Sequence, residues 1–130
     1  MDSNGLNRDE LYLILAEALF RERATFADQE ACCRAAISRA YYAAFCAARN
    51  HARDNEGLTL SNTARDHQIV FMYYAQNPNA QHTAIASTLH RLRRERNRAD
   101  YDDRNIQRVD GLTQNVLHQA RQVFIVLQQL

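Results

Sequence analysis

The stretch that decides the fold is residues 34–49, RAAISRAYYAAFCAAR. On a helical wheel with Ile37 as the reference, one apolar sector spans about 80° on either side and contains Cys33, Ala40, Tyr41, Ala44, Phe45 and Ala48. Arg34 falls inside this sector, and the many alanines permit close approach of neighbouring helices. We therefore predict a long central helix that is capped by Asp28, runs to about Asp54 and is ended by Gly57.

The composition favours helix almost throughout the chain. The 130 residues include only three Gly and one Pro, and 46% are hydrophobic. This length suits one domain, residues 1–130, with a core of its own. We predict an all-α, antiparallel bundle of four to five helices.

The remaining helices are placed by their caps and spacing. One is expected over residues 7–23, with Asn7 as the cap. A shorter one should be capped by Ser61 or Asn62 and broken at residues 77–79, Asn-Pro-Asn. A fourth is expected over residues 84–98, and a last one from Val109, with apolar residues every three or four positions, to the chain end.

The first predicted helix has apolar residues on two sides. One side is a continuous stripe of Leu11, Ile14, Leu15, Ala18 and Leu19. Leu13 and Phe20 lie opposite, so a second buried surface is expected there. Either a dimer contact or a later helix of the same chain could cover that second surface.

Charge and cysteine usage restrict the function classes. The formal net charge is +1, so any nucleic-acid contact must come from local clustering. Cys32, Cys33 and Cys46 form no paired spacing, which indicates reduced thiols and a cytoplasmic location. No metal-ligand spacing, Gly-rich phosphate loop or membrane-length apolar run is present, so we predict no metal, no cofactor and no membrane anchor.

A second informative stretch is residues 89–102, LHRLRRERNRADYD. It contains Arg91, Arg93, Arg94, Arg96 and Arg98, whose planar donors match phosphate or carboxylate groups. On the wheel, Arg96 and Asp100 share the apolar stripe of Leu89, whereas Arg91, Arg94 and Arg98 face solvent. The inward pair is either an internal ion pair or part of a binding site.

Together the blocks SRAYYAAFCAAR (residues 38–49) and RNRADYD (residues 96–102) resemble HEPN domain proteins. The resemblance implies a helical bundle that forms a homodimer, often encoded beside a nucleotidyltransferase partner. Many HEPN proteins are metal-independent ribonucleases with toxin, antitoxin or defence roles. The implied function is RNA binding, with endoribonuclease activity left open.

The resemblance also implies site residues. Arg96 and Asn97 match the start of the ribonuclease motif, and Asp100 stands where a His is expected. Arg96 and Asp100 are the candidate catalytic residues, and the candidate RNA-binding residues are Arg93, Arg94, Asn97, Arg98 and Tyr101. The alternatives are a non-catalytic dimeric module that binds a nucleotidyltransferase, or a small-molecule-binding bundle with a dry pocket lined by Tyr41 or Tyr42.

Overall fold

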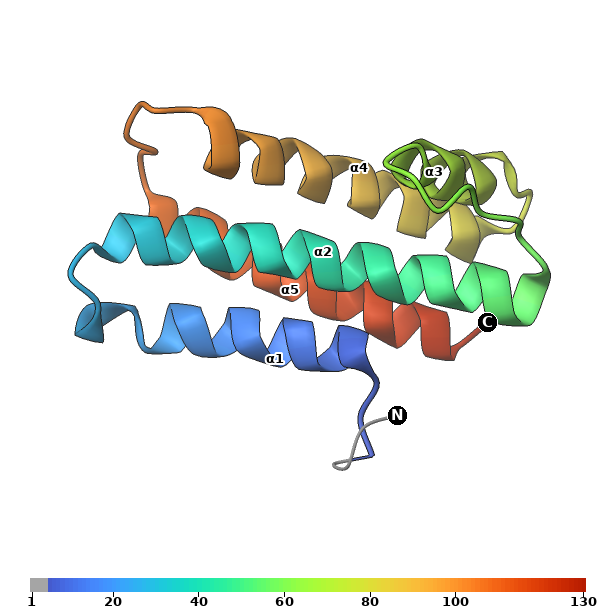
Figure 1. Ribbon diagram of the computed structural model, residues 1–130, viewed down its shortest axis with the longest axis horizontal. Helices are drawn as coiled ribbons and strands as arrows, with labels where there is room; N and C mark the ends of the chain where they lie inside the picture. Colours follow the sequence, from blue (N-terminus) through green and yellow to red (C-terminus); the bar gives the residue numbers. More distant parts are fainter. Residues whose placement is uncertain (1–4) are drawn as a thin grey trace.

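The computed structural model describes residues 5–130, which contain five α-helices, one short 3-10 helix and no strand. The helices are α1 (Arg8–Arg21), α2 (Gln29–Glu56), α3 (Asp66–Gln76), α4 (Ala80–Tyr101) and α5 (Val109–Gln128), and the 3-10 helix η1 is Arg23–Thr25. In Figure 1, α1, α2, α4 and α5 lie along the long axis in alternating directions, and the short α3 lies across one end. The predicted all-α bundle is confirmed.

Helix α2 is the centre of the bundle and has the predicted ends. The Asp28 carboxylate accepts a hydrogen bond from the Ala31 N–H at 3.0 Å. Gly57 ends the helix in the left-handed region with φ of 77°, a conformation that glycine adopts without a steric cost. Helices α1, α4 and α5 all pack against α2. Its buried alanines are Ala36, Ala40, Ala43, Ala44, Ala47, Ala48 and Ala52.

Helix α1 turns a different side to the core than its longest apolar stripe predicts. Leu13 and Ala16 are fully buried, and Phe20 packs against the core cluster. Ile14 and Leu15 of the predicted stripe are exposed, at 43% and 46%. Other helices of the same chain, α2 and α5, therefore cover the Leu13 side.

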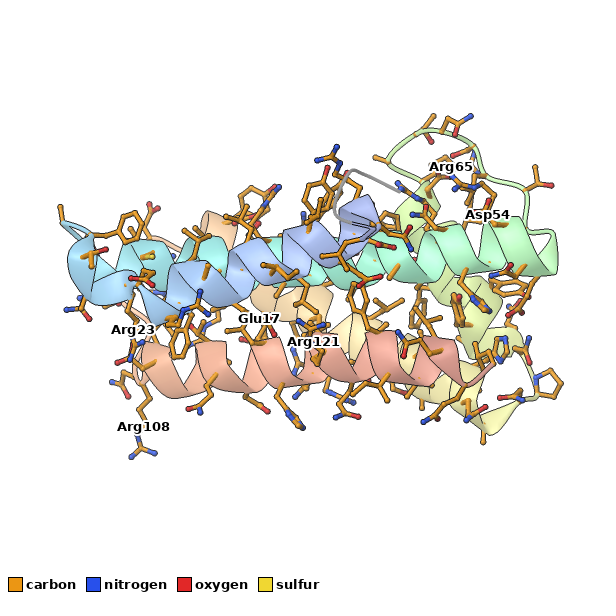
Figure 2. The ribbon with its side chains drawn as sticks, turned by 90° about the horizontal axis from the view of Figure 1, so that it is seen from below. Glu17, Arg23, Asp54, Arg65, Arg108 and Arg121 are labelled. Carbon is orange, nitrogen blue, oxygen red and sulfur yellow. The ribbon has the colours of Figure 1, made fainter. Side chains whose placement is uncertain are left out.

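Contacts on either side of Leu13 explain this orientation. Glu17 accepts a hydrogen bond from Arg121 of α5 at 2.6 Å, and Figure 2 shows the two side chains pointing toward each other. Tyr12 packs against Tyr42 of α2, with ring centroids 5.3 Å apart. Because both sides of α1 are apolar, the periodicity of the sequence does not decide which side faces the core. These contacts with α2 and α5 decide it.

The prediction that Ser61 or Asn62 caps α3 is wrong, because the helix begins at Asp66. The Asp66 carboxylate instead accepts hydrogen bonds from the Ser61 N–H at 2.8 Å and the Asn62 N–H at 3.0 Å. A further bond from the Ser61 hydroxyl is the main reason that the pKa of Asp66 lies below its ordinary value. Ser61 and Asn62 thus belong to a loop that folds back onto Asp66.

Helix α4 is longer than residues 84–98 at both ends. The Asn79 side chain caps it by accepting hydrogen bonds from the N–H groups of Gln81 at 2.8 Å and His82 at 3.2 Å. The helix ends at Tyr101, within the predicted polar segment. Helix α5 begins at Val109 as predicted, and its buried stripe includes Val116, Ala120, Val123 and Leu127.

Arg34 of α2 ties the end of α4 to the bundle. Its Nη1 donates to the main-chain oxygens of Ala99, at 3.1 Å, and Asp102, and its Nη2 donates to that of Arg104. Its Nε donates to the Glu30 carboxylate at 3.1 Å. The apolar-sector position of Arg34 is thus explained by main-chain carbonyls that need donors at a helix C-terminus.

Among the helices of residues 5–130, none combines the length and apolar character that a membrane span requires.

Candidate functional site

A pocket of about 330 Å³ lies between α2, α3 and α4. Its walls are mostly apolar and its rim carries polar and charged groups. We call it the α4 pocket. The apolar walls come from Tyr41, Phe45, Phe71 and Leu89, and the polar groups are His67, Gln68, His90, Arg93, Arg94 and Asn97.

Stacked rings form one wall of the α4 pocket. Tyr41 and Phe45 are four residues apart on α2, so their side chains lie one turn apart on the same face. The His67 ring of α3 stacks on Phe45 with a centroid distance of 4.0 Å and an interplanar angle of 13°. This wall has the flat, apolar surface on which a planar ligand stacks.

His67 is held by the aromatic wall and by a hydrogen bond between its Nδ1 and the Tyr41 hydroxyl. Burial is the main cause that lowers the pKa of His67 from 6.5 to about 4, and the guanidinium groups of Arg93 and Arg96 lower it further. Burial likewise raises the pKa of Tyr41 to about 12. Both side chains are therefore neutral at pH 7, and Arg93 and Arg94 bring positive charge to the pocket lining.

Arg93 is the polar group of the α4 pocket that most clearly lacks a partner. Its Nε is buried and has no hydrogen-bond partner within residues 5–130. Because this atom is closed to solvent, a ligand in the pocket would contact the Nη atoms of the guanidinium and not Nε. Arg94 lines the same pocket one residue further along α4. The pocket thus combines an apolar stacking wall with cationic donors.

The predicted RNA-binding residues divide into two groups. Arg93, Arg94 and Asn97 line the α4 pocket. Arg98 is exposed and lies 3.6 Å from the Glu95 carboxylate. Tyr101 is 76% exposed at the end of α4 and is not among the pocket residues.

The predicted catalytic residues lie next to the α4 pocket but do not line it. The Arg96 guanidinium is 5.1 Å from the centroid of the Tyr41 ring. Its Nε is 4.0 Å from the Asp100 carboxylate, which also accepts a 3.2 Å hydrogen bond from the Ser38 hydroxyl. Asp100 therefore has two partners inside the chain.

Phe45 and His67 of the pocket were not among the predicted site residues, and Tyr41 was predicted only as a wall of the alternative small-molecule pocket. The Tyr41 and Phe45 spacing on one helix face is a sequence signal for an aromatic wall, although core packing produces the same signal. No spacing rule connects His67 to them, since it follows Phe45 by a loop and belongs to another helix. Its position depends on how α3 crosses α2 and α4.

No family model, curated protein or solved structure matches the chain. Within residues 5–130, no group of three or more His, Cys, Asp or Glu side chains is arranged to hold a metal ion.

Proposed function

We propose that this chain binds single-stranded RNA through the α4 pocket. The observation that carries the proposal is Arg93, a cation without an ion-pair partner among residues 5–130, on the same pocket lining as the stacked rings of Phe45 and His67. Stacking of a base on an aromatic side chain contributes about 1–3 kcal/mol and tolerates any base. A guanidinium beside it supplies charge-assisted hydrogen bonds to phosphate.

The shape of the pocket favours a single strand over a duplex. Bases in a duplex are stacked on each other and cannot enter a hollow of about 330 Å³, whereas an unpaired base can turn out of the strand. The charged donors also argue against the dry pocket of a small-molecule bundle, since Arg93 and Arg94 both reach the lining. A nucleotide unit has both the planar ring and the anion that this lining suits.

The resemblance to HEPN proteins supports the same ligand class. Binding is better supported than cleavage, because Asp100 places a negative charge within 4.0 Å of Arg96, where a phosphate would otherwise bind. Metal-independent cleavage by Arg96 and Asp100, dimerisation and a nucleotidyltransferase partner remain predictions of the resemblance.

Fluorescence anisotropy with a labelled ten-nucleotide RNA tests the binding proposal. Arg93→Gln should weaken binding at least about tenfold, because it removes a cation in contact with phosphate. The slope of log affinity against log salt should also become smaller by about 0.7 for each lost phosphate contact.

Arg108→Gln is the matched control, since Arg108 is exposed at the opposite end of the bundle from Asp54 and Arg65 (Figure 2). Circular dichroism establishes that both variants are folded. Equal affinity of wild type and Arg93→Gln, or preference for duplex RNA, would contradict the proposal.

Cleavage is tested separately with end-labelled RNA in excess EDTA, beside an Arg96→Ala variant. Products that disappear in the variant would establish a metal-independent nuclease. Bound but intact RNA would restrict the function to binding.

A further inference from the structure

A second hollow, of about 400 Å³, adjoins the rings that wall the α4 pocket. It shares Phe45 and His67 with the α4 pocket, and its remaining walls come from α2, from the loop between α2 and α3, and from Asp66 at the start of α3. We call it the loop pocket. The residues that line it and not the α4 pocket are Tyr42, Arg49, Arg53, Leu60, Asn62, Thr63 and Asp66. Because the two hollows share two side chains, they are neighbours on the surface of the bundle.

Arg49 is the cation that the loop pocket offers to an anion. Its guanidinium carbon is 5.7 Å from the centroid of the Phe45 ring, and its Nε donates to the Asn50 side chain at 3.0 Å. Arg53 differs because its Nε and Nη2 both bind the Asp54 carboxylate, at 2.7 and 3.1 Å. The charge of Arg53 is thereby compensated. Arg49 has no carboxylate within salt-bridge distance among residues 5–130, although the Asp66 carboxylate lines the same pocket and its pKa is lowered in part by the charge of Arg49.

The loop side of this pocket is held in place by its own hydrogen bonds. Asp66 binds the N–H groups of Ser61 and Asn62, and Thr63 exchanges a 2.7 Å hydrogen bond with the Ser61 hydroxyl. Asn62 is thereby kept at a φ of 60°, which non-glycine residues adopt rarely. A wall already held in this way loses little conformational entropy when a ligand binds.

We propose that the α4 pocket and the loop pocket are adjoining subsites for two successive nucleotides of one strand. One nucleotide stacks in the α4 pocket beside Arg93. The phosphate of its neighbour binds Arg49 in the loop pocket. This inference rests on the proposed RNA binding. It adds a path for the strand over the protein surface, from α4 past α3 to the loop that follows α2.

Cation placement supports this path. Arg93 and Arg94 line only the first hollow and Arg49 lines only the second, so each of the two hollows has a cation of its own. Phosphates in a strand are likewise separated by one nucleoside. A mononucleotide can use only one of the two sets of cations, whereas a dinucleotide can use both.

Competition against a labelled ten-nucleotide RNA tests the path with two unlabelled ligands, AMP and the dinucleotide pApA. For wild type, pApA should compete at a concentration about tenfold lower than AMP, which is the usual effect of one additional charge-assisted phosphate contact. The ratio of the competing concentration of AMP to that of pApA is therefore about ten for wild type. Arg49→Gln should reduce this ratio to about one or two and leave competition by AMP unchanged. Arg49→Lys, which keeps the cation, should retain part of the gain.

Arg53→Gln is the matched control, because it removes an arginine from the same pocket whose charge Asp54 already compensates. Arg53→Gln should leave the ratio of the competing concentrations of AMP and pApA unchanged.

Two results would overturn the inference: an unchanged ratio in Arg49→Gln, including an equal loss of AMP and pApA competition, or the same loss of ratio in Arg53→Gln. The proposed function fails in a different way, because wild type would then bind neither the labelled RNA nor either competitor.

Discussion

Replacement of Arg34 by lysine should destabilise the protein by about 2 kcal/mol. Arg34 donates to three main-chain oxygens after and within the last turn of α4 and to Glu30, and its side chain is only 17% exposed. Lysine keeps the charge beside Glu30 but lacks the planar fork that reaches several acceptors at once. We expect two carbonyl hydrogen bonds to be lost, each with a net contribution of about 1 kcal/mol.

Urea unfolding followed by circular dichroism measures this loss. The midpoint should fall while the slope with urea stays the same, because the folded state remains compact. In thermal unfolding, 2 kcal/mol corresponds to a decrease of about 8 °C for a domain of this size. Proteolysis should become faster within residues 102–108, which lose their attachment to α2.

Arg108→Lys is the control, since Arg108 is exposed and close in sequence to the same segment. If the free energy of unfolding of Arg34→Lys lies within about 0.5 kcal/mol of the wild-type value, water or neighbouring side chains satisfy the carbonyl groups at the end of α4 equally well. The assignment of Arg34 as the residue that holds the end of α4 would then be refuted.

Three further predictions concern the core and the α4 pocket. Tyr74→Phe should cost about 1 kcal/mol in urea unfolding, because the fully buried Tyr74 hydroxyl donates to the Ala48 oxygen at 2.7 Å; a neutral result would show that this bond contributes nothing. Leu92→Ala should cost about 2–5 kcal/mol by the same measurement, because Leu92 is 0% exposed and its loss leaves a cavity; a cost below about 1 kcal/mol would mean that the helices close the space. The pKa of His67 is lowered from 6.5 to about 4, so the unfolded chain binds its proton more readily and stability should fall as the pH decreases from 6.5 toward 4. Urea midpoints at pH 7 and pH 5 should differ less in His67→Gln than in wild type, and equal differences would assign the pH dependence to other groups.

The candidate site shows where sequence reasoning succeeds and where it stops. Arg93, Arg94 and Asn97 belong to one helix and to the Arg-rich stretch that the sequence singles out, and they line the α4 pocket, whereas Arg98 and Tyr101 of the same stretch do not. Phe45 and His67 reach the same pocket from α2 and α3, and only the crossing of these helices brings them to Arg93. RNA as the ligand and kinship with HEPN proteins stay predictions.

Local signals in the sequence determined the helices and most of their ends. Asp28 and Gly57 mark the two ends of α2, and the apolar spacing after Val109 predicts α5. Both signals are local, because capping and amphipathicity depend on residues a few positions apart. Tertiary structure alone decided the rotation of α1, which has two apolar sides. It also decided the pairing of Arg34 with the end of α4. These features depend on contacts between segments distant in the sequence, whose free energies no local pattern contains.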